Sequence, residues 1–278
     1  MSKLTLQELE STLWQCADIL RGELTGAEYK DYIFGMLFLK RLNDEFYEER
    51  EARKKEFLED GLEEDEIEEL LEDASIYETF FVPEQARWSK LKDLTLNIGP
   101  ELDKAFKAIE DEPKNSELVS VLSTTNYNDK EKVPDKKLSQ LLILFNSINL
   151  ANSNLESEDM LGDAYQYLIK QFADQGGKKG GEFYTPTEVV KIITNILKPQ
   201  EGDRIYDPTC GSGGMLIQSI EYVKKHGGNP KNLSLFGQEI NLSTWAICKM
   251  NMLFHGAKGA DIQKGDTIRE PKHTEGGA

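Results

Sequence analysis

The sequence predicts an α/β protein in which an N-terminal helical domain precedes a Rossmann-like parallel sheet. In the first 150 residues, apolar side chains recur at helical spacing and no strand-rich stretch is present. After Gly181, short apolar runs alternate with helical segments, and one run breaks into the glycine turn Asp207–Gly214. Strands that alternate with helices form parallel sheets, whose loops at the carboxyl ends of the strands bind ligands.

The helices expected in the first part of the chain rest on apolar residues three and four positions apart. They cover residues 4–20, 29–47, 62–72, 101–109, 135–148 and 159–173. Prolines and glycines separate these stretches, as expected for loops between helices. We interpret residues 1–155 as a helical domain used for contacts with other macromolecules.

The net charge of −17 is unevenly distributed along the chain. Residues 1–150 contain 34 acidic and 19 basic side chains, whereas residues 151–278 contain 16 and 14. Residues 48–73 alone hold 14 acids and 4 bases. This acidic run is compatible with a docking surface or a mimic of DNA phosphates, but a solvated helical face is the interpretation we favour. The total charge therefore says little about what the second half binds.

The cysteines, histidines and apolar runs indicate whether the chain has disulfides, binds a metal or crosses a membrane. Cys16, Cys210 and Cys248 are too far apart for a zinc motif and do not form an even disulfide framework. His226, His255 and His273 are too scattered for a metal site. No apolar run approaches the roughly 20 residues that cross a bilayer, and the N-terminus lacks a signal-peptide pattern. We expect reduced thiols, no metal, no membrane association and a cytoplasmic location.

A glycine-rich stretch, residues 174–181, marks the expected boundary before the α/β fold. Thr185 and Glu188 have the spacing of a capping box, and Pro186 would then occupy the first helical position. The helix is expected to end before Pro199. Helix initiation does not explain the aromatic pair Phe183 and Tyr184, which lies just outside the cap.

The α/β region reads as three strands joined by two helices. Strands are expected over 204–207, 233–239 and 260–267, and helices from the glycine turn to about 225 and over 242–255. The first strand ends in Asp207, the second in Glu239, and the third in Gly265 and Asp266. The carboxyl ends of parallel strands meet at one edge, so these carboxylates are candidates for one site.

The glycine turn and Glu239 together indicate the class of ligand. Glu239 follows Gly213 by 26 residues, near the spacing at which a second-strand carboxylate accepts hydrogen bonds from ribose hydroxyls. The turn does not fit G-x-G-x-x-G because residue 216 is leucine, and no Gly-Lys-Ser/Thr follows for a phosphate-binding loop. A ligand with ribose and adenine but no pyrophosphate fits better, and S-adenosylmethionine is the common example.

Taken together, these segments resemble the modification (M) subunit of type I restriction-modification systems, an adenine-N6 DNA methyltransferase family. The strings that match are GGKKGGEFYTPTEVV, DPTCGSGGMLI, FGQEIN, TWAICKMNMLFHG and GDTI. The acidic helical half also resembles the N-terminal domain of that family. The resemblance implies that residues 156–278 are the first part of the sheet of a methyltransferase domain that binds S-adenosylmethionine.

The resemblance also implies roles for individual residues. Glu182, Phe183, Tyr184, Thr185, Pro186 and Thr187 would line the methionine end of the cofactor. Asp207, Thr209, Gly211, Ser212 and Gly213 would form the turn beneath it. Glu239 would hold the ribose, and Asp266 would bind the adenine amino group.

One departure from the family pattern limits what these residues are expected to do. The family has an Asn-Pro-Pro-Phe/Tyr motif, which binds the amine of a flipped-out base and stacks on its ring, after the strand that follows Gly-Asp. The sequence contains no such string, so no catalytic residue is assigned, and we expect cofactor binding at most, without methyl transfer. The resemblance implies double-stranded DNA, a specificity (S) subunit, a restriction (R) subunit and a second M subunit as partners.

Two other functions are compatible with the sequence. A catalytically inactive interaction protein, or a DNA mimic, could retain both the helical domain and the cofactor fold. A small-molecule or RNA methyltransferase could share only the cofactor turn, but the helical domain and the Phe-Tyr-Thr-Pro segment would then need separate explanations.

Overall fold

The computed structural model describes residues 3–22, 24–157, 159–176, 181 and 184–274. The chain forms two compact units, which are described separately. The helical unit comprises Met1–Glu23 and Tyr32–Met160, and the sheet unit comprises Leu24–Asp31 and Leu161–Ala278. The segment Leu24–Asp31 therefore belongs with the sheet, although more than a hundred residues separate it from the rest of that unit.

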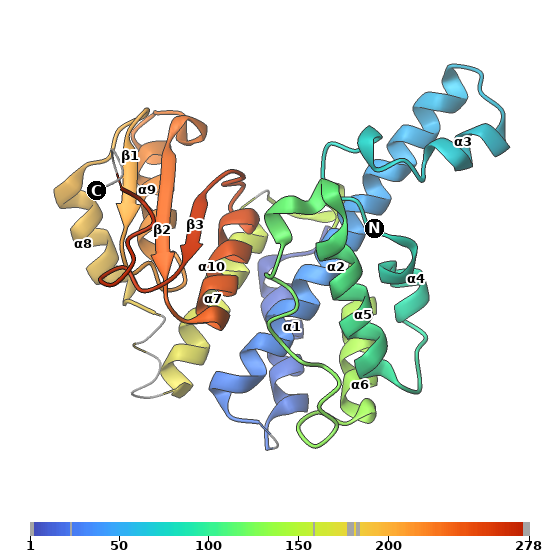
Figure 1. Ribbon diagram of the computed structural model, residues 1–278, viewed down its shortest axis with the longest axis horizontal. Helices are drawn as coiled ribbons and strands as arrows, with labels where there is room; N and C mark the ends of the chain where they lie inside the picture. The colour runs from blue at the N-terminus through green and yellow to red at the C-terminus, as the bar shows by residue number, and fades with distance from the viewer. Residues whose placement is uncertain (1–2, 23, 158, 177–180, 182–183, 275–278) are drawn as a thin grey trace. The chain divides into compact units, whose positions relative to one another are not determined.

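The helices that make up the helical unit are shown in Figure 1. The α-helices are α1 (Leu6–Leu20), α2 (Gly26–Glu59, whose start lies in the sheet unit), α3 (Glu64–Leu70), α4 (Trp88–Leu91), α5 (Ile98–Asp111) and α6 (Asp135–Asn146). Short 3₁₀ turns cover Ala74–Ile76, Glu84–Ala86, Pro113–Leu118 and Asn152–Asn154. The expected all-helical character is confirmed, and α2 extends twelve residues beyond the expected helix, which ended at residue 47.

The middle of α2 supplies much of the core of the helical unit. Every residue from 32 to 40 is buried, so this stretch of α2 is enclosed on all sides rather than along one face, and Phe46 is fully buried further along the helix. The ring of Phe46 lies 4.9 Å from that of Tyr77. The helix is confirmed, but the apolar periodicity that predicted it marks only part of the core.

A buried ion pair lies on the same helix. The ammonium group of Lys40 contacts both carboxylate oxygens of Asp44, and the two side chains are 5% and 12% exposed. Asp44 also accepts a hydrogen bond from the backbone N–H of Leu150 at 2.6 Å. Burial raises the pKa of Asp44, and the charge of Lys40 opposes that rise. The pair thus attaches the end of the helical domain to α2.

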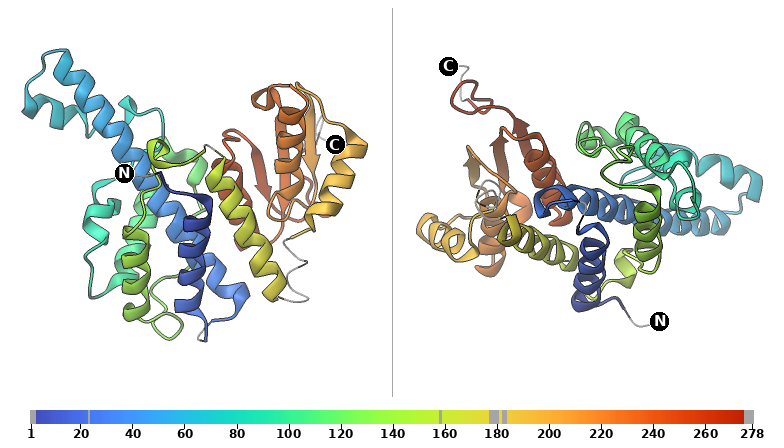
Figure 2. Two further views of the ribbon diagram at one scale, coloured as in Figure 1. Left: turned by 180° about the vertical axis from the view of Figure 1, so that it is seen from behind. Right: turned by 90° about the horizontal axis from the view of Figure 1, so that it is seen from below.

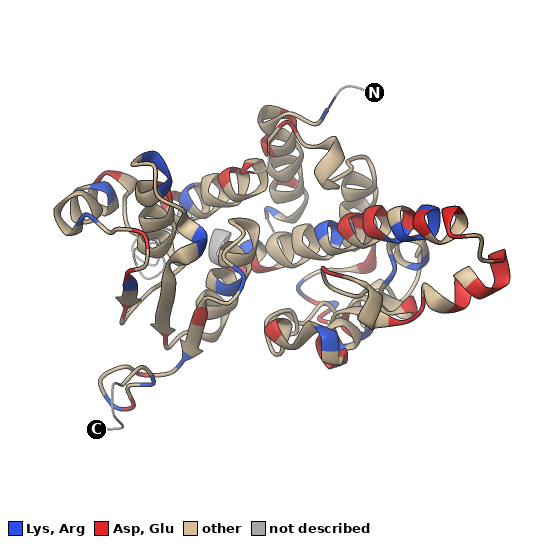
Figure 3. Ribbon diagram, turned by 90° about the horizontal axis from the view of Figure 1, so that it is seen from above, with Lys and Arg blue, Asp and Glu red and all other residues tan. Residues whose placement is uncertain are grey.

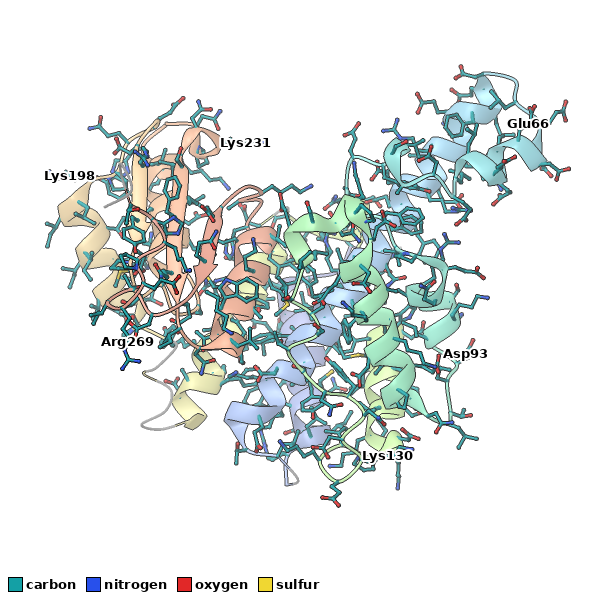
Figure 4. All side chains as sticks on the ribbon, in the orientation of Figure 1. Glu66, Asp93, Lys130, Lys198, Lys231 and Arg269 are labelled. Atoms are coloured by element: carbon teal, nitrogen blue, oxygen red, sulfur yellow. The ribbon has the colours of Figure 1, made fainter. Side chains whose placement is uncertain are left out.

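The acidic run, residues 48–73, is divided between the end of α2 and the short helix α3. Figure 3 shows acidic residues concentrated on these two elements, and Glu66, labelled in Figure 4, extends outward from α3. Basic residues of α2 partly compensate the charge, because Glu68 pairs with Arg50 at 2.9 Å and with Lys54 at 2.6 Å. These contacts connect the two helices.

The sheet unit contains α7 to α10 and the strands β1 to β3, seen from further directions in Figure 2. Its elements are α7 (Met160–Gly176), α8 (Thr187–Leu197), β1 (Arg204–Asp207), α9 (Gly214–Lys225), β2 (Ser234–Glu239), α10 (Leu242–Phe254) and β3 (Asp261–Lys264), with a 3₁₀ turn at Pro230–Asn232. The strands are parallel in the order β1-β2-β3. The predicted Rossmann-like half-sheet is confirmed.

Strand register determines which side chains share a face of the sheet. Ile205 lies beside Leu235, Asp207 beside Gly237, and Gly237 beside Ile262. Because side chains alternate along a strand, Asp207 and Glu239 lie on the same face as these apolar residues, at the carboxyl ends of β1 and β2. The opposite face carries Tyr206 and Phe236, and the ring of His273 lies 5.2 Å and 5.4 Å from theirs.

The expected start of α8 is wrong in detail. Pro186 is the N-cap residue, no side chain caps the helix, and α8 begins at Thr187 rather than at Pro186. Proline is tolerated at this position because its missing N–H leaves no donor unpaired. The expected end is confirmed, since Lys198 follows the helix in the left-handed conformation directly before Pro199.

No helix in the described part of the chain combines the length and the apolar character that crossing a membrane requires.

Candidate functional site

A cavity of about 910 Å³ lies at the carboxyl ends of the strands in the sheet unit. It is lined by the turn after β1, the residues after β2 and β3, and parts of α7, α8 and α9. The predicted site residues that line it are Tyr184, Thr185, Thr187, Asp207, Thr209, Gly211, Ser212, Glu239 and Asp266. The structure therefore brings together side chains that are separated by up to 82 positions in the sequence.

The glycine turn needs its glycines for two different reasons. Gly211 and Gly213 have φ angles of +54° and +85°, a region that costs other residues conformational energy. A Cβ atom on Gly213 would also lie 2.6 Å from Met252 Cε and 2.9 Å from Cys248 Sγ. Gly213 is the N-cap of α9, so this close packing sets where the helix begins.

Hydrogen bonds fix the turn to β2 and to α10. The backbone N–H of Cys210 donates to the carbonyl of Gln238 at 3.0 Å, and that of Gly213 donates to the carbonyl of Cys210 at 2.7 Å. The side-chain amide of Asn251, which is fully buried on α10, donates to the carbonyl of Ser212 at 2.7 Å. The turn is thus held from two sides before any ligand binds.

Glu239 is buried at the end of β2 and faces the cavity. One carboxylate oxygen accepts from the backbone N–H of Gly211 at 3.1 Å, and the other accepts from that of Asn241 at 2.8 Å. Each carboxylate oxygen has a second lone pair, so both can still accept a hydrogen bond from a ligand hydroxyl. The contact with Gly211 links the end of β2 to the glycine turn.

Asp207 lies on the neighbouring strand end and accepts a hydrogen bond from the backbone N–H of Thr209 at 3.1 Å. Burial raises the pKa of Asp207, the bond from Thr209 opposes the rise, and the negative charge of Glu239 adds to it. Two carboxylates side by side in a partly buried site favour a cationic ligand.

Asp266 follows β3 at the same end of the sheet and is engaged mainly with its own turn. Its carboxylate accepts from the backbone N–H groups of Ile268 at 3.0 Å and Arg269 at 3.2 Å. The guanidinium of Arg269 lies 3.4 Å from the same carboxylate, and this side chain extends into solvent in Figure 4. These bonds orient Asp266 at the cavity wall.

The remaining predicted residues are distributed as follows. The hydroxyl of Tyr184 lies 3.1 Å from that of Thr187, so this pair forms one part of the wall. Pro186 and Gly213 support neighbouring residues without lining the cavity. Glu182 and Phe183 lie outside the described residues.

The charged side chains of the cavity wall are mainly acidic. The described residues that contribute charge to the lining are Asp163, Asp207, Glu221, Glu239 and Asp266 on the acidic side and Lys191 on the basic side. A pyrophosphate would meet strong repulsion in such a site, whereas a cation would be attracted.

Asn251 and Cys248 contribute to the site without having been predicted to do so. Cys248 Sγ lies 3.8 Å from Cys210 Sγ, and this contact together with burial raises the pKa of Cys248 well above its usual value. Asn251 holds the turn through Ser212. An uncharged polar residue among the apolar residues Met250, Met252, Leu253 and Phe254 is the sequence signal that could have identified Asn251.

Two family models match the chain, one on each side of residue 150. The N-terminal domain of the HsdM protein matches residues 9–145, and the N-6 DNA methylase model matches residues 156–277. The methylase subunit of the type I restriction enzyme MjaIX from Methanocaldococcus jannaschii is 30% identical over 95% of this chain and 48% of its own length. The methylase subunit of the type I restriction enzyme MpnII from Mycoplasma pneumoniae is 31% identical over 94% of this chain and 52% of its own length.

A solved structure supports the same relationship. The methyltransferase subunit of the type I restriction-modification system from Streptococcus thermophilus matches with a TM-score of 0.77 and 27% identity. The match covers 99% of this chain and 61% of that one. The chain spans about half the length of the curated relatives that it matches.

Proposed function

Because this chain belongs to the family of N-6 DNA methylase subunits of type I restriction enzymes, we propose that it binds S-adenosylmethionine in the cavity at the carboxyl ends of β1, β2 and β3. In the assembled enzyme this cofactor would serve the methylation of adenine N6 in DNA. The observation that carries the proposal is the buried carboxylate of Glu239, which faces an acidic cavity next to a glycine turn.

The donor set of the cavity fits this cofactor. S-adenosylmethionine carries a sulfonium cation, an ammonium group and a ribose with two vicinal hydroxyls. The acidic lining suits the positive charges, and the second lone pairs of Glu239 suit the hydroxyls. A cavity of about 910 Å³ lies within the range of small-molecule and cofactor sites.

The roles of individual residues follow the family resemblance, and the presence of these residues in the cavity lining supports them. Glu239 accepts from the ribose hydroxyls, and Asp266, after β3, accepts from the adenine amino group. Tyr184 and Thr187 line the methionine end, and Asp207 attracts the cationic part of the cofactor. The backbone of the glycine turn lets the cofactor approach β1 closely.

The chemistry of the proposed reaction needs a base-binding group that the sequence does not contain. When bound, S-adenosylmethionine supplies an electrophilic methyl group. The adenine amine must be held in line with it, a task assigned in this family to an Asn-Pro-Pro-Phe/Tyr motif, which this sequence lacks. We therefore expect this chain alone to bind the cofactor without transferring methyl groups to DNA.

The proposed partners follow from the type I relatives. A specificity subunit would select the DNA sequence, a second modification subunit would complete the methylase, and a restriction subunit would join the larger complex. The helical unit is the proposed contact region for these partners and for double-stranded DNA. The proposed location is the cytoplasm.

Titration calorimetry tests the cofactor assignment directly. The chain should bind S-adenosylmethionine, and NAD or ATP, both of which contain a pyrophosphate linkage, should bind far more weakly. Glu239→Ala should weaken S-adenosylmethionine binding at least tenfold. Unchanged affinity in this variant would refute the ribose role. Transfer of a labelled methyl group to an adenine-containing duplex by this chain alone would refute the expected inactivity.

A further inference from the structure

A cluster of two charged side chains and a hydroxyl lies against α10, outside the cavity. The hydroxyl of Ser243 donates to Asp31 Oδ1 at 2.8 Å and accepts from Lys30 Nζ at 3.1 Å. Lys30 also contacts the carboxylate of Asp31. Lys30 and Asp31 lie near the start of α2, in the segment Leu24–Asp31 that belongs to the sheet unit.

Burial makes this cluster unusual for a helix start. The side chain of Lys30 is 7% exposed and that of Asp31 is 25% exposed. Holding an ammonium group out of water costs free energy, and a buried ion pair is weak evidence for stability. The segment already has an apolar anchor, because the ring of Tyr29 lies 5.2 Å from that of Phe172 on α7. The polar cluster therefore calls for a role beyond attaching the segment.

Ser243 connects the cluster to the cavity through the first turn of α10. Asn241, two residues earlier, is the N-cap of α10, and its side chain accepts from the backbone N–H of Thr244 at 3.0 Å. The backbone N–H of Asn241 donates to Glu239 at 2.8 Å, and Glu239 accepts from Gly211 through its other oxygen. Hydrogen bonds on either side of the first turn of α10 thus connect α2 with the glycine turn through the backbone of residues 241–243.

We infer that Lys30, Asp31 and Ser243 are positioning residues for Glu239. They hold the first turn of α10 from outside, so that Asn241 keeps the Glu239 carboxylate oriented toward the cavity. They touch no ligand themselves. The inference rests on the proposed function, because the group that they position is the proposed ribose acceptor.

Hydrogen exchange tests the positioning without any ligand. Ser243→Ala removes both contacts of the hydroxyl, and amides in residues 239–244 and at Gly211 should then exchange at least fivefold faster. Ser243→Thr keeps a hydroxyl and should restore slow exchange. Ser219→Ala is the matched control, because Ser219 is also buried in this unit but its hydroxyl donates to the carbonyl of Met215 within its own helix.

Ligand binding then separates this inference from the proposed function. Adenosine and 2′,3′-dideoxyadenosine differ only in the ribose hydroxyls, so the wild-type chain should prefer adenosine. Ser243→Ala should reduce the affinity for adenosine at least fivefold and leave that for dideoxyadenosine unchanged. Asp31→Ala should have the same effect. The double variant Asp31→Ala/Ser243→Ala should lose no more affinity for adenosine than either single variant.

Two results would overturn different parts of the argument. If wild-type chain does not discriminate between the two nucleosides, the ribose role of Glu239 fails and the inference fails with it. If wild-type chain discriminates and Ser243→Ala discriminates equally, the proposed function stands and the positioning role is refuted. Unchanged exchange at Gly211 and residues 239–244 in Ser243→Ala also refutes the positioning role.

Discussion

In the helical unit the buried carboxylate of Asp44 lies against the ammonium group of Lys40, whereas in the sheet unit the buried carboxylate of Glu239 lies against two backbone N–H groups. Among the residues that the structure describes, no basic side chain forms an ion pair with Glu239. The first charge is compensated within the fold, and the second retains acceptor capacity toward a cavity. The comparison separates a structural charge from one available to a ligand.

The largest expected effect comes from breaking the compensated pair. Lys40→Met leaves Asp44 buried without its partner, which should destabilise the helical unit by about 3–5 kcal/mol. Burial raises the pKa of Asp44 in the fold, and the Lys40 charge that opposes this rise is absent from the variant. The loss should therefore shrink as the pH falls and grow as it rises through that pKa. Hydrogen exchange of the α2 amides across a pH series measures both effects.

The double variant Lys40→Met/Asp44→Leu is the control for this prediction. It removes both charges and should recover most of the lost stability. Equal destabilisation by the single and double variants would show that packing around α2, rather than the unpaired charge, decides the outcome.

Substitution of Glu239, in contrast, should reduce ligand affinity more than it reduces the stability of the sheet unit. Glu239→Gln keeps the shape, loses one backbone hydrogen bond and should destabilise the sheet unit by only about 1 kcal/mol. Affinity for S-adenosylmethionine should fall by about 2–3 kcal/mol, roughly 30- to 150-fold, because the hydrogen bonds lost are those to a charged acceptor. Calorimetry and exchange on the same variant compare the two losses, and a larger loss in stability than in binding would contradict the assignment.

The next largest effect is expected from a substitution that disturbs the close packing of the glycine turn. Gly213→Ala requires a left-handed conformation that costs alanine about 1–2 kcal/mol, and its Cβ would press on Met252 and Cys248. Exchange should accelerate in α9 and in the turn. Gly214→Ala is the matched control, because a Cβ there meets nothing within 4 Å. Equal exchange in the two variants would contradict the packing argument.

The smallest expected effect concerns the second carboxylate of the sheet unit. Burial and the charge of Glu239 raise the pKa of Asp207, so its ionised form opposes folding once the pH rises through that pKa. Asp207→Asn should therefore slightly stabilise the sheet unit at neutral pH and have no effect at acid pH. Its affinity for S-adenosylmethionine should fall at neutral pH. Higher affinity in this variant would argue against a cationic ligand.

The sequence predicted elements where periodicity and turn chemistry agree. The bounds of β1 at residues 204–207, the end of α9 at Lys225 and the existence of α2 follow from short-range patterns. The predicted start of α8 was wrong, because a capping-box spacing at Thr185 does not ensure that its side chain caps the helix. The contacts of Asn251 with Ser212 and of Lys30 with Ser243 join distant parts of the chain, and no local pattern encodes such pairings.

Because the segment Leu24–Asp31 belongs to the sheet unit, the chain cannot be divided at residue 160 without removing part of that unit. A fragment that begins at residue 161 would encode every described strand but would leave Phe172 without Tyr29 and Ser243 without Asp31 and Lys30. Such a fragment would expose the side chains of Phe172 and Ser243 that this segment contacts. A synthetic peptide containing residues 24–31 should bind to the fragment in trans, so fragment complementation can report whether these contacts form.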